Sequence, residues 1–530
     1  MPRQKSSDIS KEVESKSSVG TRTAHVATLM IFGRFVSLFI SGIAFILIAR
    51  ILGPDTYGIY TLAAAYASIA MTICLSDLGV STAFNKFIGQ YFGRRDKSEV
   101  EKVLSSGYAA ILIYGTVISI IAFSLSGLFA PRILGSSSLT YILEAASFTI
   151  VLAMLFGMSY NALVGFGKGM YVAIIIILQS AVQSTVSVSL ALLKYGAIAP
   201  IMGLIIGYTC SIIAAILIFY TKFGVRFRMP ELAHMKELLG FSYPIAIYNN
   251  IKGFTIGLSP ILLGIFTTAV IVGNFGVAIK SGNIMSNVTD ALGLAIIPTF
   301  AYTVYTKSLS KNIGKFYNYA AYFTYLLLLP ALLYIAVLSK QFSYTLFSAK
   351  YLFAPGYLSI ISVGLLIWVI ATYTTALLIS SNKVKAILKY GLIITAVEIS
   401  LVLLVVPHFG GAGLLTILYI VTPTITCMLM ARAAKRFLSV RLEVKRLARL
   451  VAAALISAAL LVPLLLLSNY VLVLVIGAIE QVAVYPIIVA LTGAVKKEEL
   501  RVLRQITSNM PFMNRIIALL ANYSERFARG

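Results

Sequence analysis

The sequence predicts an all-α integral membrane protein with 14 transmembrane helices, and three observations lead to this fold class. Apolar residues make up 59% of the 530 residues and charged residues only 12%, with a mean hydropathy of +0.94, a composition typical of proteins that lie in lipid. Apolar stretches of about 20 residues, long enough to cross a bilayer core as a helix, recur along the chain. Basic residues collect in short runs between these stretches.

The apolar stretches define the predicted spans. The first is not predicted to be a cleaved signal peptide, because it is long, carries Arg34, lacks a small-residue cleavage site and is followed by further spans. In chain order, the 14 spans are placed at 28–49, 58–80, 103–129, 142–164, 171–193, 197–220, 242–266, 269–300, 319–339, 355–381, 386–406, 412–431, 450–468 and 470–493.

The distribution of Lys and Arg predicts the orientation of the spans, because basic loops are retained on the cytoplasmic side. With the N-terminus inside, 35 of the 43 basic residues fall in inner segments, five in outer loops and three within spans. We therefore expect a multi-pass protein of a prokaryotic plasma membrane with both termini in the cytoplasm; the Ile- and Tyr-rich composition favours an archaeal source. This topology accounts for the formal net charge of +25, so no nucleic-acid partner is expected.

Little of the chain is predicted to lie outside the membrane. The outer loops are at most about a dozen residues long, which excludes a soluble catalytic domain on that side. Segment 1–24 is rich in Ser and Lys and is predicted to be a disordered cytoplasmic N-terminus. Segment 495–530 is predicted to be an amphipathic helix on the anionic inner leaflet, from the helical spacing of Ile516, Leu520 and Tyr523, with a solvated tail as the alternative.

An internal repeat relates two halves of the chain. Tyr57-Gly58 matches Val272-Gly273 at an offset of 215 residues, and three further pairs follow in order at offsets of 214 or 215. Six spans in each half give both halves the same orientation, an arrangement typical of alternating-access transporters. The further pairs are Gly167-Lys168 with Asn382-Lys383, Tyr195-Gly196 with Phe409-Gly410, and Lys222-Phe223 with Arg436-Phe437.

The repeat predicts how the chain is organised. An N-lobe with spans 1 to 6 is placed at 25–222 and a C-lobe with spans 7 to 12 at 223–437. Spans 13 and 14, within 438–494, lie outside the repeat, and they either carry an accessory groove or pack against one lobe.

Charged residues inside spans are the first candidates for a functional site. A charge near the bilayer centre costs about 2.5 to 3.5 kcal/mol on insertion scales, so it normally faces water, substrate or a partner. The eighth span carries four polar residues at spacings of 3, 4 and 3, which fall within about 80° of arc on a helix. We expect the ammonium group among them to bind a substrate phosphate. These residues are Lys280, Asn283, Asn287 and Asp290.

Two other spans add cations at related positions. Arg34 lies in span 1, and an offset of 215 places it on Asn249 in span 7, one turn from Lys252. These residues predict a cationic substrate cavity at the interface of the lobes. Gln179 and Gln183, one turn apart in span 5, either hydrogen-bond sugars in this cavity or make ordinary contacts between helices.

Three intramembrane acids leave alternatives open. Asp77, Asp290 and Glu398 either neutralise the cations or bind a coupling H⁺ or Na⁺. Arg34 either contacts substrate or pairs with Asp77 as a gate or structural pair. No other cofactor is expected, because the three cysteines and three histidines show no metal-ligand spacing.

One outer turn carries a family resemblance. Residues 49–60 read ARILGPDTYGIY, in which Gly53 can end a helix and Pro54 cannot continue it. This segment resembles the A-R-x-L-G-P-x-x-Y-G-x-Y signature that follows the first span of polysaccharide-transporter (PST) proteins. These oligosaccharide flippases belong to the multidrug/oligosaccharidyl-lipid/polysaccharide (MOP) exporter superfamily.

Two more segments extend the resemblance over most of the chain. Residues 77–83, DLGVSTA, resemble the stretch that ends span 2 in the family. Residues 262–278 resemble the family's L-L-G…V-G-x-Y-x-x-A stretch between spans 7 and 8, with Phe275 in place of the usual Tyr.

The resemblance implies a V-shaped, two-lobed transporter of the MOP type. Such a protein would flip a lipid-linked oligosaccharide, on a polyprenyl or dolichyl phosphate or diphosphate, from the cytoplasmic to the outer leaflet by alternating access, for polysaccharide or glycan export. Related flippases have a basic cavity, which agrees with Arg34, Lys252 and Lys280. A monomer is expected, since a cavity between two lobes needs no second chain.

Two alternatives remain open. A multidrug exporter of the same superfamily would move organic cations and need an acidic cavity, against which the three intramembrane cations argue. A membrane glycosyltransferase or polymerase would need acidic catalytic residues on an outer loop, where Asp55 is the only acid. The sequence therefore favours a transporter over an enzyme.

Overall fold

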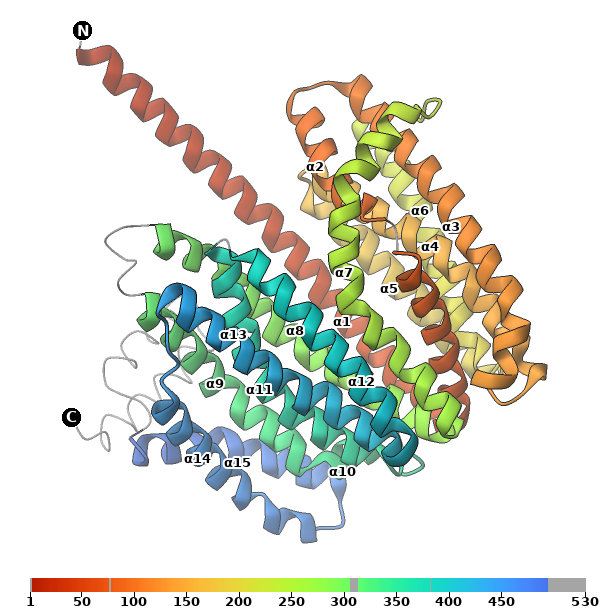
Figure 1. Ribbon diagram of the computed structural model, residues 1–530, viewed down its shortest axis with the longest axis vertical. Coiled ribbons are helices and arrows are strands. Elements are labelled where there is room, and N and C mark those ends of the chain that lie inside the picture. The colour runs from red at the N-terminus through yellow and green to blue at the C-terminus, as the bar shows by residue number, and fades with distance from the viewer. Residues whose placement is uncertain (1, 76–77, 306–312, 382, 494–530) are drawn as a thin grey trace. The chain divides into compact units, whose positions relative to one another are not determined.

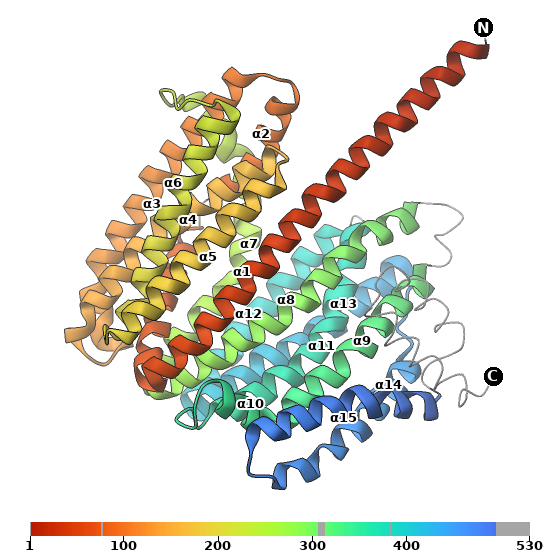
Figure 2. The same cartoon turned by 180° about the vertical axis from the view of Figure 1, so that it is seen from behind.

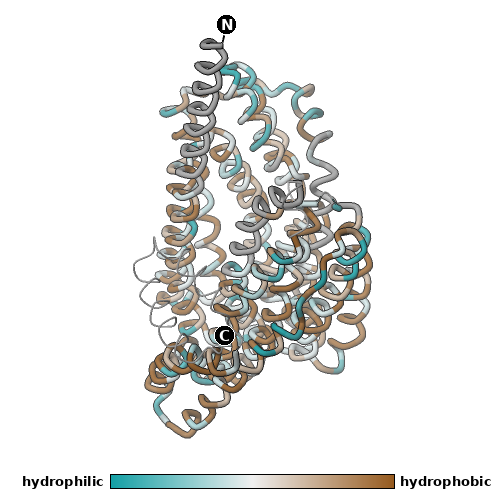
Figure 3. Tube along the Cα trace, turned by 90° about the vertical axis from the view of Figure 1, so that its left-hand side faces the viewer, coloured by the Kyte–Doolittle hydropathy of each residue, from teal (hydrophilic) through white to brown (hydrophobic). Residues whose placement is uncertain are grey.

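The computed structural model describes residues 2–75, 78–305, 313–381 and 383–493, and every regular element within them is helical. The contacts divide the chain into two compact units, an N-terminal unit (Met1–Gly273) and a C-terminal unit (Asn274–Gly530). The apolar residues run along most of the length of the helices (Figure 3). The N-terminal unit contains α1 (Pro2–Ile73), α2 (Val80–Gly93), α3 (Lys97–Ile133), α4 (Thr140–Gly165), α5 (Gly169–Leu192), α6 (Ile198–Phe223) and α7 (Leu232–Phe266).

The second unit begins within α8 (Ala269–Tyr305), which crosses the division between the units. Figures 1 and 2 show its helices running side by side. It continues with α9 (Ile313–Val337), α10 (Ser339–Leu346), α11 (Ala354–Ser380), α12 (Val384–Thr416), α13 (Thr422–Leu438), α14 (Val444–Leu460) and α15 (Tyr470–Leu491). The lobes at 25–222 and 223–437 remain predictions, because the division by contacts follows a different criterion from the repeat.

Ten helical segments among the described residues are long and apolar enough to cross a membrane. Two of them are broken by a glycine, Gly53 (φ 73°, ψ 172°) in α1 and Gly410 (φ 54°, ψ −139°) in α12, in backbone conformations that favour glycine. Each broken segment carries two of the expected spans. The prediction of a multi-pass membrane protein is confirmed, whereas the count of 14 spans remains a prediction.

The structure describes the N-terminal segment of the chain but not residues 494–530. Segment 1–24, for which the sequence predicts disorder, is helical from Pro2 onward as part of α1. Residues 494–530, which include the predicted amphipathic helix, lie outside the described residues.

Small residues let the helices of the N-terminal unit approach closely. A Cβ atom on Gly33 of α1 would lie 2.6 Å from the Ala173 Cβ of α5, and one on Gly169 would lie 2.3 Å from the Val26 carbonyl oxygen. Helices in lipid associate through such contacts, because burial of apolar surface gives no net gain there. The α1–α5 seam is therefore held by backbone proximity.

The closest approach joins the repeat-related glycines. A Cβ on Gly58 would lie 1.8 Å from the Ala269 carbonyl oxygen, and one on Gly273 would lie 1.8 Å from the Pro54 carbonyl oxygen. Glycine at both positions is required because the α1 backbone after its break touches the start of α8. The glycine of the Tyr-Gly pair in the family signature thus has a packing role.

A hydrogen bond between a tyrosine and a hydroxyl residue joins corresponding helices in each unit. The hydroxyls of Tyr108 and Ser159 join α3 to α4 at 2.6 Å, and those of Tyr317 and Thr374 join α9 to α11 at 2.7 Å. Ser159 and Thr374 are 215 residues apart, the offset seen in the sequence, whereas Tyr108 and Tyr317 are 209 residues apart. The helix ends agree as well, since α6 ends at residue 223 and α13 at residue 438.

Helix α14 packs on the second half of the repeat at the position that corresponds to α7 on the first half. In the C-terminal unit α14 packs against α9, as α7 packs against α3 in the N-terminal unit. The loop before each is held in a similar way, by a bond from Glu231 N to the Ser106 hydroxyl and one from Glu443 N to Asn318 Oδ1. Helix α14 thus follows the second half as α7 follows the first.

Candidate functional site

Arg34 lies on the exposed side of α1. Its neighbours Gly33 and Ser37 face α5, where the Ser37 hydroxyl is hydrogen-bonded to that of Ser180. The guanidinium group is exposed, and no acidic side chain among the described residues of the N-terminal unit pairs with it. The proposed partner, Asp77, lies outside the described residues.

The two glutamines of α5 are hydrogen-bonded to each other. Gln179 Nε2 donates to Gln183 Oε1 at 2.6 Å, and both side chains are half-buried. Gly203 and Gly207 of α6 allow close contact here, since a Cβ on Gly207 would lie 2.9 Å from the Gln183 Cβ. The pair therefore borders a tight helix seam and keeps one amide oxygen and one amide nitrogen for a further ligand.

The polar stripe of α8 is exposed on the C-terminal unit. Lys280, Asn283 and Asn287 are all exposed, and Asn287 Nδ2 donates to the Asn283 carbonyl oxygen at 2.8 Å. The opposite face of α8 is tightly packed, because a Cβ on Gly282 would lie 2.6 Å from Ile361 of α11. Lys280 has no acidic partner among the described residues of this unit.

The other candidates are only partly described. Asn249 and Lys252 lie in α7 and Asp290 in α8, but their side chains are outside the described residues. Glu398 is half-buried on α12. The roles assigned to these residues therefore stay predictions.

An ionic cluster that the sequence did not predict joins the start of α7 to the start of α3. His234 Nε2 lies 2.9 Å from Glu99 and its Nδ1 lies 3.0 Å from Glu231, while Lys102 Nζ lies 3.3 and 3.4 Å from the same two carboxylates. Two of these four pairs join residues three apart, but the pairs His234–Glu99 and Lys102–Glu231 join residues more than 100 apart, which no linear pattern could have shown.

A buried carboxylate lies beside this cluster. Glu101 is only 3% exposed and binds Arg228 Nε at 2.6 Å and Arg226 N at 3.0 Å. The Ser105 hydroxyl accepts from Arg228 N. Together these contacts fix the loop that follows α6, and they are structural in character.

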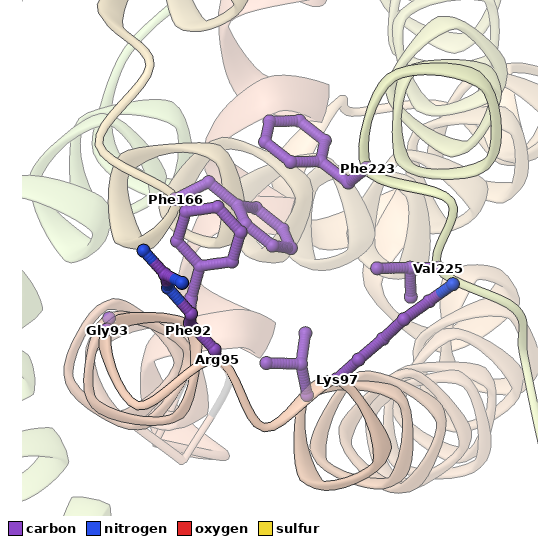
Figure 4. Close-up of a pocket in the computed structure, with 9 residues that line it drawn as sticks. Phe92, Gly93, Arg95, Lys97, Phe166, Phe223 and Val225 are labelled. Carbon is purple, nitrogen blue, oxygen red and sulfur yellow. The ribbon is translucent and has the colours of Figure 1, made fainter.

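A pocket of about 500 Å³ opens at the same end of the N-terminal unit (Figure 4). Its apolar wall includes Phe92, Phe166 and Phe223, and its cations are Arg95 and Lys97. The sequence analysis counted these two cations only toward topology. No sequence pattern indicated this pocket, because its three aromatic residues lie far apart in the chain, in α2, directly after α4 and at the end of α6.

Residues 26–304 match the model of a family described as polysaccharide biosynthesis protein, which covers more than half of the chain. None of the curated proteins matches the sequence significantly.

Several solved structures are similar in fold. The lipid II flippase MurJ in an inward closed conformation is 16% identical, with a TM-score of 0.70 over 88% of this chain and 98% of that chain. An inward-facing multidrug resistance MATE family transporter of the MOP superfamily is 15% identical, with a TM-score of 0.61 over 77% and 98%. A MOP superfamily transporter from Pyrococcus furiosus is 14% identical, with a TM-score of 0.52 over 79% and 95%. At these identities the likeness shows the fold, which is of the MOP type.

Proposed function

Because this chain belongs to the family of polysaccharide biosynthesis proteins, we propose that it is a transporter that flips a lipid-linked oligosaccharide. The carrier is a polyprenyl or dolichyl phosphate or diphosphate, and transport runs from the cytoplasmic to the outer leaflet by alternating access. The family match carries the proposal. The MurJ likeness supports it, since that protein is itself a lipid II flippase.

The exposed cations favour an anionic substrate. Arg34 and Lys280 each lie exposed on their own unit without an acidic partner among its described residues. An unpaired charge in a membrane-spanning helix is costly unless water or a ligand meets it. We propose that Lys280 contacts a phosphate of the substrate and that Asn283 and Asn287 hydrogen-bond nearby oxygens. Arg34 is proposed separately as a cationic substrate contact of the N-terminal unit.

The proposal also covers the oligomeric state, the membrane and the coupling ion. We place the protein as a monomer in a prokaryotic plasma membrane with both termini inside, on the charge bias of its loops. Asp77, Asp290 or Glu398 would bind H⁺ or Na⁺ if transport is ion-coupled. No other cofactor is proposed.

The test is flipping of a labelled polyprenyl-diphosphate glycan in proteoliposomes. Lys280→Ala is expected to reduce the rate at least about tenfold, because a hydrogen bond to a charged group contributes about 1.5 to 3 kcal/mol. Lys350→Ala is the matched control, since Lys350 is an exposed lysine outside the membrane-spanning helices. Equal flipping by both variants would remove Lys280 from the transport site.

The second candidate is an organic-cation exporter, which the MATE likeness favours. Thermal stabilisation of the detergent-purified protein separates the two, because a ligand that binds the folded state raises its melting temperature. Stabilisation by a short-chain polyprenyl-diphosphate glycan, but not by a cationic dye, is expected for the flippase. The reverse result would favour the exporter.

A further inference from the structure

The pocket of Figure 4 has an apolar wall and a cationic opening. The rings of Phe166 and Phe223 stack with centroids 4.1 Å apart, and Phe92 meets both edge-on at 5.0 and 6.0 Å. Phe166 and Val225 are only 2% and 3% exposed, whereas Phe92 is 38% exposed. Phe166 and Val225 thus form the buried base of the aromatic cluster, and Phe92 is its exposed ring.

Two cations flank the opening of the pocket. Figure 4 shows Arg95 and Lys97 on opposite sides of the pocket with their charged ends pointing away from each other, and both side chains are exposed. Neither makes an ion pair within the described residues.

The nearest acids in the sequence are engaged elsewhere. Asp96 accepts a hydrogen bond from Glu99 N at 3.1 Å, and Glu101 is held by Arg228. Neither carboxylate forms an ion pair with Arg95 or Lys97, although Asp96 keeps its negative charge between them in the sequence.

The pocket lies at the level where membrane-spanning helices end. Candidate spans begin at Lys97 and end at Gly165 and Phe223, and these residues either line the pocket or adjoin it. In a bilayer this level holds the phosphate groups of the lipids. Cations there bind the phosphates, while apolar side chains meet the glycerol and the first acyl carbons.

We propose that this pocket binds the headgroup of an anionic phospholipid, with Arg95 and Lys97 as the cations that attract its phosphate. The volume suits a headgroup and its first acyl carbons, whereas an oligosaccharide on its carrier would not fit. A zwitterionic headgroup is disfavoured because Arg95 and Lys97 would repel its ammonium group. The inference uses only the membrane setting and does not depend on the proposed flippase activity.

The test is a melting titration of the full-length, detergent-purified protein with short-chain phosphatidylglycerol, and with phosphatidylcholine of the same chain length. Phosphatidylglycerol is expected to stabilise the protein more. The double variant Arg95→Ala/Lys97→Ala should bind it at least about tenfold more weakly.

The matched control is Arg94→Ala/Lys236→Ala. These two cations are also exposed at the same end of the unit but do not line the pocket, and the variant loses the same net charge. Its affinity for phosphatidylglycerol should change less than about twofold. An equal loss in both double variants would mean general attraction of the basic surface for anionic lipid, and would overturn the proposal.

Two further ligands in the same titration distinguish other sources of phosphate. Inorganic phosphate should give no stabilisation that depends on Arg95 and Lys97; if it stabilises as well as the lipid does, the site is an anion site and not a lipid site. If only a polyprenyl-diphosphate glycan acts through these residues, the pocket belongs to the transport route. If the alanine variant melts at a lower temperature even without lipid, Arg95→Gln/Lys97→Gln replaces it, because glutamine keeps most of each side chain. Bound phosphatidylglycerol is then counted by native mass spectrometry.

Discussion

Replacement of Gly58 by alanine is expected to destabilise the N-terminal unit through backbone overlap. The added Cβ would lie 1.8 Å from the Ala269 carbonyl oxygen, and contacts below 3.0 Å are essentially never seen for real Cβ atoms. The α1 and α8 backbones must therefore separate by more than 1 Å, because no side chain can move aside. Overpacking costs about 1 to 3 kcal/mol, and a clash with backbone should fall at the upper end.

The assay is the melting temperature of the detergent-purified variant. A loss of about 3 kcal/mol in a unit of this size lowers the melting temperature by roughly 5 °C or more. Gly42→Ala is the control in the same helix, since a Cβ there has nothing within 4 Å. It should be neutral or stabilising by about 0.5 to 1 kcal/mol, because alanine favours helix. A Gly58→Ala protein that melts together with Gly42→Ala would refute the close approach of the two backbones.

Two more substitutions test the packing within each unit. Tyr317→Phe removes the 2.7 Å bond to Thr374 and should cost about 0.5 to 1.5 kcal/mol, because Thr374 keeps its bond to the Ile370 carbonyl oxygen; an unchanged melting temperature would contradict a stabilising bond there. Glu101→Ala should cost about 1 to 3 kcal/mol, since it leaves Arg226 N and Arg228 without their acceptor. Glu99→Ala, which removes a part-exposed carboxylate, should stay within about 1 kcal/mol, and an equal effect of the two would show that burial of Glu101 does not matter.

The sequence predicted more of the architecture than of the site. The membrane class followed from composition, and the break after the first span followed from Gly53 and Pro54, because φ near 73° favours glycine in any context. The repeat was visible because related segments kept glycine and aromatic residues at a constant offset. The shared face of Lys280, Asn283 and Asn287 could be predicted because helical geometry depends only on spacing.

Tertiary structure alone decided which distant residues meet. The reason for glycine at position 58 became clear only when its backbone was found against Ala269, more than 200 residues away. The aromatic wall of the pocket likewise combines residues from three distant parts of the chain, and the exposure of Arg34 depends on which face of α1 packs on α5. Local sequence determines the period of a helix and where it breaks, but the contacts between helices depend on all of their surfaces at once. The apolar composition of the membrane-spanning helices could therefore be predicted from the sequence, whereas the pocket and the contact of Gly58 with Ala269 could not.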